Sequence, residues 1–331
     1  MTIRSTVIAL ALCAAAQFSA ATAMAEDVTL RVVSAYPASH NFNKPLLGLI
    51  DAVNKEDKGV KLNFVGGPET LPSGEMMQAL QNGVVDVFYG ASSLFVGDVP
   101  EVLAVNGSNM SAMELRERGA LDALSKYFEE RVNARYLGYF GSGYTFYIYL
   151  FKEPKMTADG MVDLSGWSIR GGAPYRAFLD RLDANMISIF PPEMYSAMER
   201  GVIDGMIWVS VSLTGEGWEK FIKYRITPGW RQGDISLQVN LDKWNSLGDE
   251  QKALLTEKTA EYERVAHDGY QAMASKDLEA LRAAGMKDIA LEGEARKTYL
   301  QGAIGLLWDD MKKTVPADRV EELKSYFYKE D

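Results

Sequence analysis

Residues 75–86, EMMQALQNGVVD, recur without a gap as residues 193–204, EMYSAMERGVID, and six of the twelve positions are identical. In each copy, apolar residues at helical spacing lead to a glycine, Gly83 or Gly201, and β-branched residues follow it directly. This pattern predicts a helix that ends at a left-handed glycine and then a buried strand. Two copies of one helix–strand unit predict two related lobes, and a chance similarity of two generic units is the alternative.

The rest of the chain alternates between strand and helix patterns. Residues 28–34 alternate like a strand, residues 136–151 are dense in aromatic and β-branched residues, and residues 249–284 form one long helical stretch. Such alternation is typical of the α/β class. The length of 331 residues is about twice that of a single domain, which agrees with two lobes. We expect the long helix to brace both of them.

The N-terminus has the pattern of a secretory signal peptide. After one positive charge, residues 7–16 are apolar, and Ala23-Met24-Ala25 offers a cleavage site before Glu26. An uncleaved anchor is the alternative, but the apolar run is too short to cross about 30 Å of hydrocarbon. We therefore predict removal of residues 1–25, export to the periplasm and a mature chain without cysteine, because Cys13 is the only one.

The charge balance excludes some partners. Lys and Arg total 35 and Asp and Glu total 45, so the formal net charge is −10. Proteins that bind nucleic acid carry a basic surface, so nucleic acid is not an expected partner. After the signal peptide, the apolar stretch 206–213 is too short to span a bilayer, and we expect a protein that is not embedded in the membrane.

The sequence lacks the signatures of common catalytic sites. H-E-x-x-H, G-x-S-x-G and the phosphate-binding glycine loops are absent, and the chain has two histidines, His40 and His267. Pairs of carboxylates stay open as acid–base catalysts, although 45 acidic residues make coincidental pairs inevitable. We expect no enzyme, no catalytic residue, no cofactor and no metal ligands.

One motif offers binding chemistry. Residues 163–170, DLSGWSIR, place Arg170 at the end of a short predicted strand, before Gly171 and Gly172. A guanidinium can hold a carboxylate through two parallel hydrogen bonds and is always charged. From the residues alone, an ordinary surface cation is the more frequent explanation.

Together with the repeat and with residues 240–247, NLDKWNSL, this motif resembles the extracytoplasmic solute-binding proteins of TRAP transporters, the DctP-like family. The resemblance implies two α/β lobes of the periplasmic-binding-protein (Venus flytrap) fold, with a long helix at the hinge and a small organic acid between the lobes. It also implies delivery of this carboxylate ligand to a TRAP permease with one small and one large membrane subunit.

The resemblance also assigns roles to residues. Arg170 matches the arginine that clamps the ligand carboxylate, and Trp208 stands where many members place a residue that contacts the ligand. Phe146 falls near a position that carries a second polar or basic contact in other members, which argues against a second charged clamp there. Family members that bind keto acids with a cation carry Glu before the Trp. Ile207 stands there in this chain, so we expect no bound metal.

Other candidates rest on their positions in loops and at strand ends. For these, packing in the core or simple exposure stays open as the alternative. Which face of the strand at residues 144–149 lines the cleft also stays open. These substrate-binding candidates are His40 and Asn41, Tyr89 and Ser92, and Trp230 and Arg231.

We expect lobe I to span residues 26–148, with part of 236–265 returning to it, and lobe II to span 149–235, with residues 266–331 packed on it. The expected ligand is a monocarboxylate with an apolar or aromatic body. A dicarboxylate stays open if Arg231 or His40 makes a second contact, and a sugar acid if Ser92 and Asn41 point inward. The alternative functions are a binding protein that feeds a sensor or another type of transporter, and a periplasmic enzyme.

Overall fold

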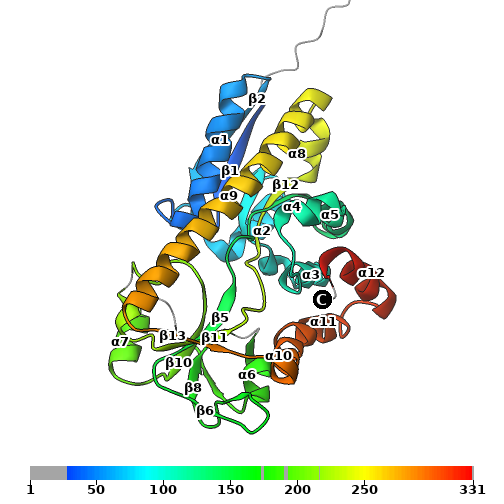
Figure 1. The fold of residues 1–331 in the computed structure, drawn as a ribbon. Helices are drawn as coiled ribbons and strands as arrows, with labels where there is room; N and C mark the ends of the chain where they lie inside the picture. The colour runs from blue at the N-terminus through cyan, green and yellow to red at the C-terminus, as the bar shows by residue number, and fades with distance from the viewer. Residues whose placement is uncertain (1–27, 173–174, 190–192, 216, 330–331) are drawn as a thin grey trace, which may run out of the picture.

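The computed structural model describes residues 28–329 apart from 173–174, 190–192 and 216. The predicted signal peptide and its cleavage site lie outside the described residues. The chain forms two α/β lobes, one above the other in Figure 1, with a long helix running alongside both. The expected two-lobed fold with a long bracing helix is confirmed.

Lobe I is built on a five-stranded sheet with the order β2-β1-β3-β12-β4. The first three strands are parallel, and β12 returns from late in the chain, antiparallel to both of its neighbours. The strands are β1 (Val28–Ser34), β2 (Val60–Gly66), β3 (Val87–Ala91), β4 (Ala134–Tyr139) and β12 (Ile235–Asn240). Its helices are α1 (Lys44–Glu56), α2 (Ser73–Gln81), α3 (Leu103–Asn106), α4 (Ala112–Glu117), α5 (Ala120–Val132) and α8 (Leu241–Ser246), with short 3-10 turns η1 (Asn41–Asn43), η2 (Ser92–Phe95) and η3 (Pro100–Val102).

Lobe II is built on a six-stranded sheet with the order β13-β11-β5-β10-β8-β9. Strand β10 is parallel to β8 and antiparallel to β5. The strands are β5 (Phe146–Leu150), β8 (Ser168–Arg170), β9 (Asn185–Ile187), β10 (Gly205–Val209), β11 (Tyr224–Thr227) and β13 (Lys287–Ala290), and a separate hairpin joins β6 (Lys155–Met156) to β7 (Val162–Asp163). Its helices are α6 (Arg176–Arg181) and α7 (Met194–Glu199), with the 3-10 turn η6 (Trp218–Lys220).

The stretch expected to be a single strand, residues 136–151, forms two strands, β4 in lobe I and β5 in lobe II. Gly143 lies in the segment between them, at a φ of 96°. A Cβ there would lie 2.3 Å from the carbonyl oxygen of His267, so only glycine fits this approach to the long helix. The chain therefore crosses between the lobes just before β5, a few residues earlier than the expected boundary at residue 148.

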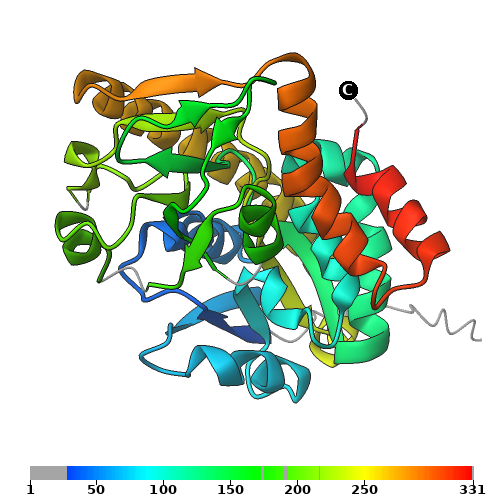
Figure 2. The ribbon, with the colours of Figure 1, turned by 90° about the horizontal axis from the view of Figure 1, so that it is seen from below.

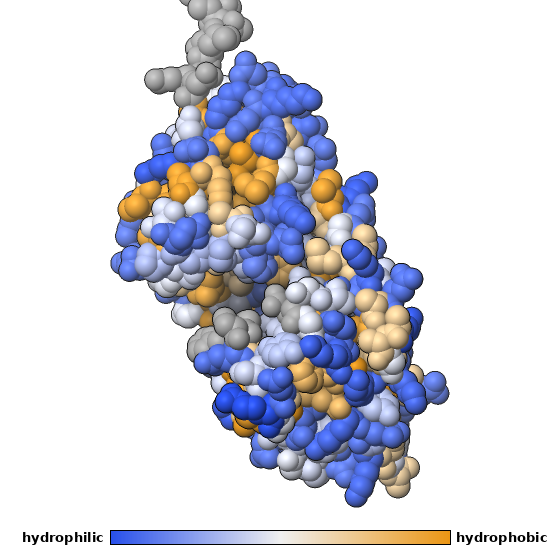
Figure 3. Space-filling view, turned by 90° about the vertical axis from the view of Figure 1, so that its left-hand side faces the viewer, coloured by the Kyte–Doolittle hydropathy of each residue, from blue (hydrophilic) through white to orange (hydrophobic). Residues whose placement is uncertain are grey.

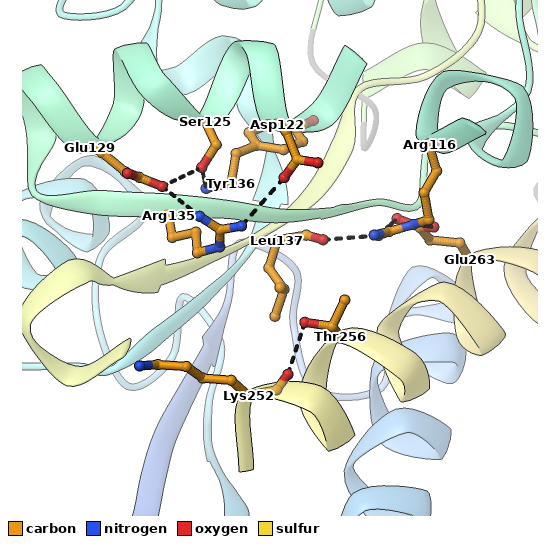
Figure 4. A network of polar contacts seen from close by, with 10 residues as sticks. All are labelled: Arg116, Asp122, Ser125, Glu129, Arg135, Tyr136, Leu137, Lys252, Thr256 and Glu263. Atoms are coloured by element: carbon orange, nitrogen blue, oxygen red, sulfur yellow. Dashed lines mark hydrogen bonds and ion pairs between the residues drawn. The ribbon is translucent and has the colours of Figure 1, made fainter. Parts of the chain in front are cut away.

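The long helix α9 (Asp249–Ala283) is attached to both lobes. In lobe I, the buried carboxylate of Glu263 accepts hydrogen bonds from the Tyr139 amide (2.7 Å) and from Arg116 (2.7 and 2.8 Å), and Figure 4 shows the Arg116 guanidinium pointing toward it. In lobe II, Asp277 accepts hydrogen bonds from the Leu213 amide (3.0 Å) and the Thr214 hydroxyl (2.7 Å). Burial raises the pKa of Glu263, and Arg116 opposes that rise.

The C-terminal helices, which we expected to pack on lobe II, contact both lobes. They are α10 (Gly293–Leu300), the π-helical turn η7 (Gln301–Gly305), α11 (Leu306–Met311) and α12 (Ala317–Phe327). Their first part contacts lobe II, where Tyr299 of α10 packs on Phe178 of α6 and η7 lies against α6. Helix α11 contacts α3, and α12 contacts α3 and α5, of lobe I. Figure 2 shows α12, in red, beside the helices of lobe I.

Side-chain packing explains the path of these helices. Trp308 lies so close to Gly107 of lobe I that a Cβ there would be 2.7 Å from the indole ring. Val320, Leu323 and Phe327 recur at helical spacing and are buried, so one face of α12 completes the core of lobe I. Arg319 adds an ion pair to the buried Glu101 of lobe I at 3.0 Å.

Candidate functional site

The repeated units have the same local geometry in the two lobes. Gly83 and Gly201 end their helices at φ angles of 68° and 66°. The aspartate that closes each copy accepts a hydrogen bond from the neighbouring parallel strand: Asp86 from the Arg31 amide at 2.8 Å, and Asp204 from the Ser168 amide at 3.0 Å. Each unit therefore fixes one parallel strand pair, β1 with β3 and β8 with β10.

The candidate site lies where the strands of lobe II end toward lobe I. Strands β8 and β10 end there, next to Phe146, the first residue of β5 after the chain crosses between the lobes. Ligands of open α/β sheets bind beyond the carboxyl ends of the strands. Figure 3 shows that the surface is hollowed between the two lobes.

Arg170, at the end of β8, is half-buried and forms no ion pair with any described residue. Its Nε donates to the Ile189 carbonyl at 3.1 Å and its Nη1 to the Ile207 carbonyl at 3.4 Å. The guanidinium carbon lies 4.7 Å from the centre of the Trp208 ring. Burial lowers the pKa of Arg170, and Tyr175 opposes this. The side chain is thus held in one orientation while its charge is left without a carboxylate.

Trp208, in β10, also packs against Trp218, whose ring centre lies 5.0 Å away in a T-shaped arrangement. Its indole Nε1 is buried and has no hydrogen-bond partner among the described residues. A buried donor without a partner is costly. The indole N–H and the Arg170 guanidinium are therefore two donors, close together, with unused capacity.

The side chains of β5 divide between the two faces of the sheet. Tyr147 pairs with Trp208 in the sheet, and Tyr147 and Tyr149 pack with the Trp208 face. Phe146 lies on the opposite face, where its ring centre is 5.7 Å from that of Tyr175. Because Phe146 is the first residue of the strand, it reaches the edge that faces lobe I.

Residues 228–234 connect β11 of lobe II to β12 of lobe I and form the second segment that crosses between the lobes. Arg231 lies in this segment, and its side chain contacts Phe146. Its guanidinium carbon is 4.6 Å from the Phe146 ring centre and 5.5 Å from that of Tyr175. Tyr175 contacts both Phe146 and Arg231. Burial raises the pKa of Tyr175, Arg231 and Arg170 lower it, and Asp234 of lobe I raises it.

The other sequence candidates belong to lobe I. His40 and Asn41 are exposed in the loop after β1, where the imidazole Nδ1 accepts a hydrogen bond from the Phe42 amide at 3.1 Å. Burial lowers the pKa of His40. Ser92 is buried, and its hydroxyl has no partner among the described residues. Its amide donates to the Asp234 carbonyl at 2.8 Å.

Two candidates are core residues in this structure. Tyr89 is 0% exposed and its hydroxyl donates to the Phe42 carbonyl at 3.0 Å. Trp230 is 3% exposed and packs against Phe178 and Tyr299, with ring centres 5.3 and 5.9 Å away. Their positions in loops and at strand ends did not distinguish a cleft from the core.

Sequence reasoning missed Tyr175 and Asp234. Tyr175 follows the glycines after Arg170, and no feature of the sequence separates it from the other tyrosines of the chain. Asp234 precedes β12, and one carboxylate oxygen accepts a hydrogen bond from the Ser93 amide at 3.2 Å. Asp234 comes close to the site only because distant segments pack together, and the same packing places Tyr175 beside Phe146 and Arg231.

A separate cavity of about 510 Å³ lies between the crossing segments and α9. Two of the sequence candidates, Trp230 and Arg231, line it, together with Tyr147 of β5 and His267 of α9, whereas Arg170 and Trp208 do not. Arg231 therefore borders this rear cavity and also contacts Phe146 and Tyr175.

The described residues lack two kinds of feature. No three His, Cys, Asp or Glu side chains are grouped as a metal site within the described ranges. Among the helices of the same residues, none combines the length and the apolar composition needed to cross a membrane.

Comparisons with known proteins agree with the resemblance. The family model for bacterial extracellular solute-binding proteins, family 7 (DctP), matches residues 53–314. A curated relative, the monocarboxylate 2-oxoacid-binding periplasmic protein of Nostoc sp., is 24% identical over 277 residues, which are 81% of this chain and 74% of the relative.

Solved structures share the fold. A TRAP periplasmic solute-binding protein from Ochrobactrum anthropi superposes with a TM-score of 0.77 at 19% identity, covering 91% of this chain and 95% of its own. A TRAP transporter solute-binding protein from Bordetella bronchiseptica, with calcium and picolinate in its site, gives a TM-score of 0.70 at 23% identity, covering 91% and 92%.

Proposed function

The chain belongs to the DctP family, family 7 of the bacterial extracellular solute-binding proteins, and we propose that it captures a small organic acid between its lobes and delivers it to a TRAP membrane permease. The family consists of solute-binding proteins rather than enzymes. In this proposal the signal peptide directs the chain to the periplasm, and the small and large membrane subunits of the permease receive the ligand.

The observation that carries the proposal is the uncompensated charge of Arg170. Its guanidinium is half-buried and oriented by two backbone carbonyls and the Trp208 ring, and it has no acidic partner among the described residues. A carboxylate that accepts from Arg170 would remove the cost of its unpaired charge. Arg170 thus anchors the carboxylate, and the Trp208 ring, 4.7 Å from the guanidinium carbon, supplies an apolar wall.

Arg170 provides a binding position for one carboxylate. The simplest ligand that fits is therefore a monocarboxylate with an apolar or aromatic body that lies against Trp208 and Phe146. The names of the relatives support this class: the Nostoc protein binds monocarboxylate 2-oxoacids, and picolinate in the Bordetella structure also carries a carboxylate.

Binding in this proposal favours a closed form. A ligand that touches both lobes stabilises only the arrangement in which both can reach it, so it shifts the population toward that state. Closure must change the backbone conformation of the connections between the lobes. These are the segments just before β5 and just before β12, and the helix α9. Asp234, at the lobe I side of the group, lies where lobe I would approach the ligand.

The test is a thermal-shift screen of residues 26–331 against aliphatic, aromatic, keto-, dicarboxylic and sugar acids, after unfolding and refolding to remove any resident ligand. A ligand at about 100 times its dissociation constant adds about 2.7 kcal/mol to the free energy of unfolding. Small-angle scattering of the same sample should show compaction with that ligand. No shift with any acid contradicts the proposal, and chemical conversion of a stabilising acid supports the enzyme alternative instead.

A further inference from the structure

The rear cavity is a second space in which a small molecule would fit. Its volume of about 510 Å³ lies within the usual range of ligand pockets, about 300–1,000 Å³. Its walls come from both lobes, the crossing segments and α9, and they include Asn109 of lobe I, Ser210 of lobe II, Gln232 of the second crossing segment and Gln271 of α9. Asn109 and Gln271 are exposed, so the cavity is open to solvent on their side.

The charged side chains of this cavity have one sign. Arg225 and Arg231 line it, and no Asp or Glu is among its described lining residues. The chain as a whole carries a formal net charge of −10, so a space of this size without an acidic wall contrasts with the rest of the molecule. A hollow lined by one sign of charge concentrates the electric field and attracts ions of the opposite sign. The lining therefore favours an anion.

Asp288 compensates the charge of Arg225 only in part. The Arg225 Nε donates to the Asp288 carboxylate at 2.7 Å, and Arg282 donates to the same carboxylate at 2.6 Å. Two cations thus share one anion, and the group keeps a positive charge. The Arg225 guanidinium carbon lies 4.5 Å from the ring centre of Tyr147, which also lines the cavity. This cation–π contact holds the guanidinium at the wall of lobe II.

Arg231 is a buried cation of the cavity wall that lacks an acidic partner among the described residues. It is 5% exposed, and its Nε donates to the Gln232 carbonyl at 3.3 Å. A buried charge without a partner is costly. Asp234 follows closely in the chain, but its carboxylate accepts a hydrogen bond from the Ser93 amide, and it does not line the cavity. An anion in the cavity would supply the charge that Arg231 lacks.

The shape of the cavity is fixed by contacts within the protein. The Gln232 Oε1 accepts a hydrogen bond from the Gly143 amide at 3.2 Å, and its Nε2 donates to the Met110 carbonyl at 2.7 Å. This side chain therefore joins both crossing segments to lobe I, and a preformed wall lowers the cost of ordering when a ligand binds. We propose that the rear cavity binds a small oxyanion, with a phosphate or carboxylate group near Arg225 and Arg231. This site is separate from Arg170 and does not depend on the acid bound there.

The test uses the Arg170→Met variant, which lacks the proposed clamp of the cleft, and measures binding by isothermal titration calorimetry in a phosphate-free buffer. The probes are inorganic phosphate, phenyl phosphate and benzoate. At least one of them should bind at one site per chain with a dissociation constant of about 1 mM or lower. Equal affinities for inorganic phosphate and phenyl phosphate assign the site to free phosphate, whereas tighter binding of phenyl phosphate or benzoate assigns it to a small organic anion.

Two variants made in that background test the position of the site. Gln271→Glu adds a negative charge to the exposed wall with almost no change in shape, and it should weaken binding about fivefold or more. Arg231→Met should weaken it about 30-fold or more. Ala253→Glu is the matched control, because Ala253 is exposed on the same helix, roughly 27 Å away along its axis. This control should leave the affinity unchanged.

Absence of binding by all three probes in Arg170→Met would overturn the inference, including the case in which the wild-type protein binds them through Arg170. Equal weakening by Gln271→Glu and Ala253→Glu would also overturn it, because only the net charge of the chain would then matter. Gln271→Glu is informative even if Arg231→Met does not fold, since Gln271 is exposed. None of these results changes the test of the acid in the cleft, so the two proposals can fail independently.

Discussion

Replacement of Arg170 by methionine should abolish tight ligand binding without unfolding the protein. In the complex, the variant leaves a desolvated carboxylate unpaired, at a cost of about 2–5 kcal/mol, which is a loss of about 30-fold to 4,000-fold in affinity. In the free protein the effects oppose each other. The contacts with two carbonyls and the Trp208 ring are lost, while an unpaired charge no longer has to be buried. The free energy of unfolding should therefore change by about 1 kcal/mol or less.

Isothermal titration calorimetry with the best acid from the screen measures the affinity, and urea unfolding of ligand-free protein measures the stability. Arg200→Met is the matched control, because Arg200 is exposed on the same lobe. Its guanidinium donates to Ser196 of α7, to the carbonyl at 3.2 Å and to the hydroxyl at 3.4 Å. That variant should bind like the wild type. An Arg170→Met protein whose dissociation constant lies within threefold of the wild-type value would refute the clamp.

Three further predictions concern stability. Asp86→Ala should lower the free energy of unfolding in urea by about 3–5 kcal/mol, because the Asp86 carboxylate is fully buried and paired. Asp204→Ala should lower it clearly less, since the Asp204 side chain is 26% exposed. Equal losses in the two variants would contradict this reasoning from burial. Lys329 and the Ser111 amide lower the pKa of Glu114 from 4.5 to about 2. The stability difference between wild type and Glu114→Gln should therefore be fully present above pH 4.5 and shrink as the pH falls toward 2, and a constant difference across that titration would rule out this linkage. Trp308→Ala should lower the free energy of unfolding by about 3–5 kcal/mol, because it removes a buried indole from the contact between the C-terminal helices and lobe I. A melting temperature like that of the wild type would argue that this contact does not stabilise the protein.

Local sequence patterns predicted the elements that depend on neighbouring residues. The helix–glycine–strand unit was visible twice, because helical spacing and a left-handed glycine act within a dozen residues. The long helix was predicted at 249–284 and observed as Asp249–Ala283. The strand at 136–151 was predicted as one element because its composition is uniform, whereas Gly143 and the packing of α9 divide it into two.

By itself, the sequence determined the α/β class, the two related lobes, the bracing helix and, through a family motif, Arg170 as the candidate clamp. Only the tertiary structure decided which side chains share the cleft. It buried Tyr89 and Trp230 in the cores, turned α12 back onto lobe I, and brought Arg231 beside Phe146 and Tyr175. Backbone conformation depends mainly on adjacent residues, so a short motif is enough to predict it. The surroundings of a side chain are set by segments many residues away, whose packing no local pattern specifies.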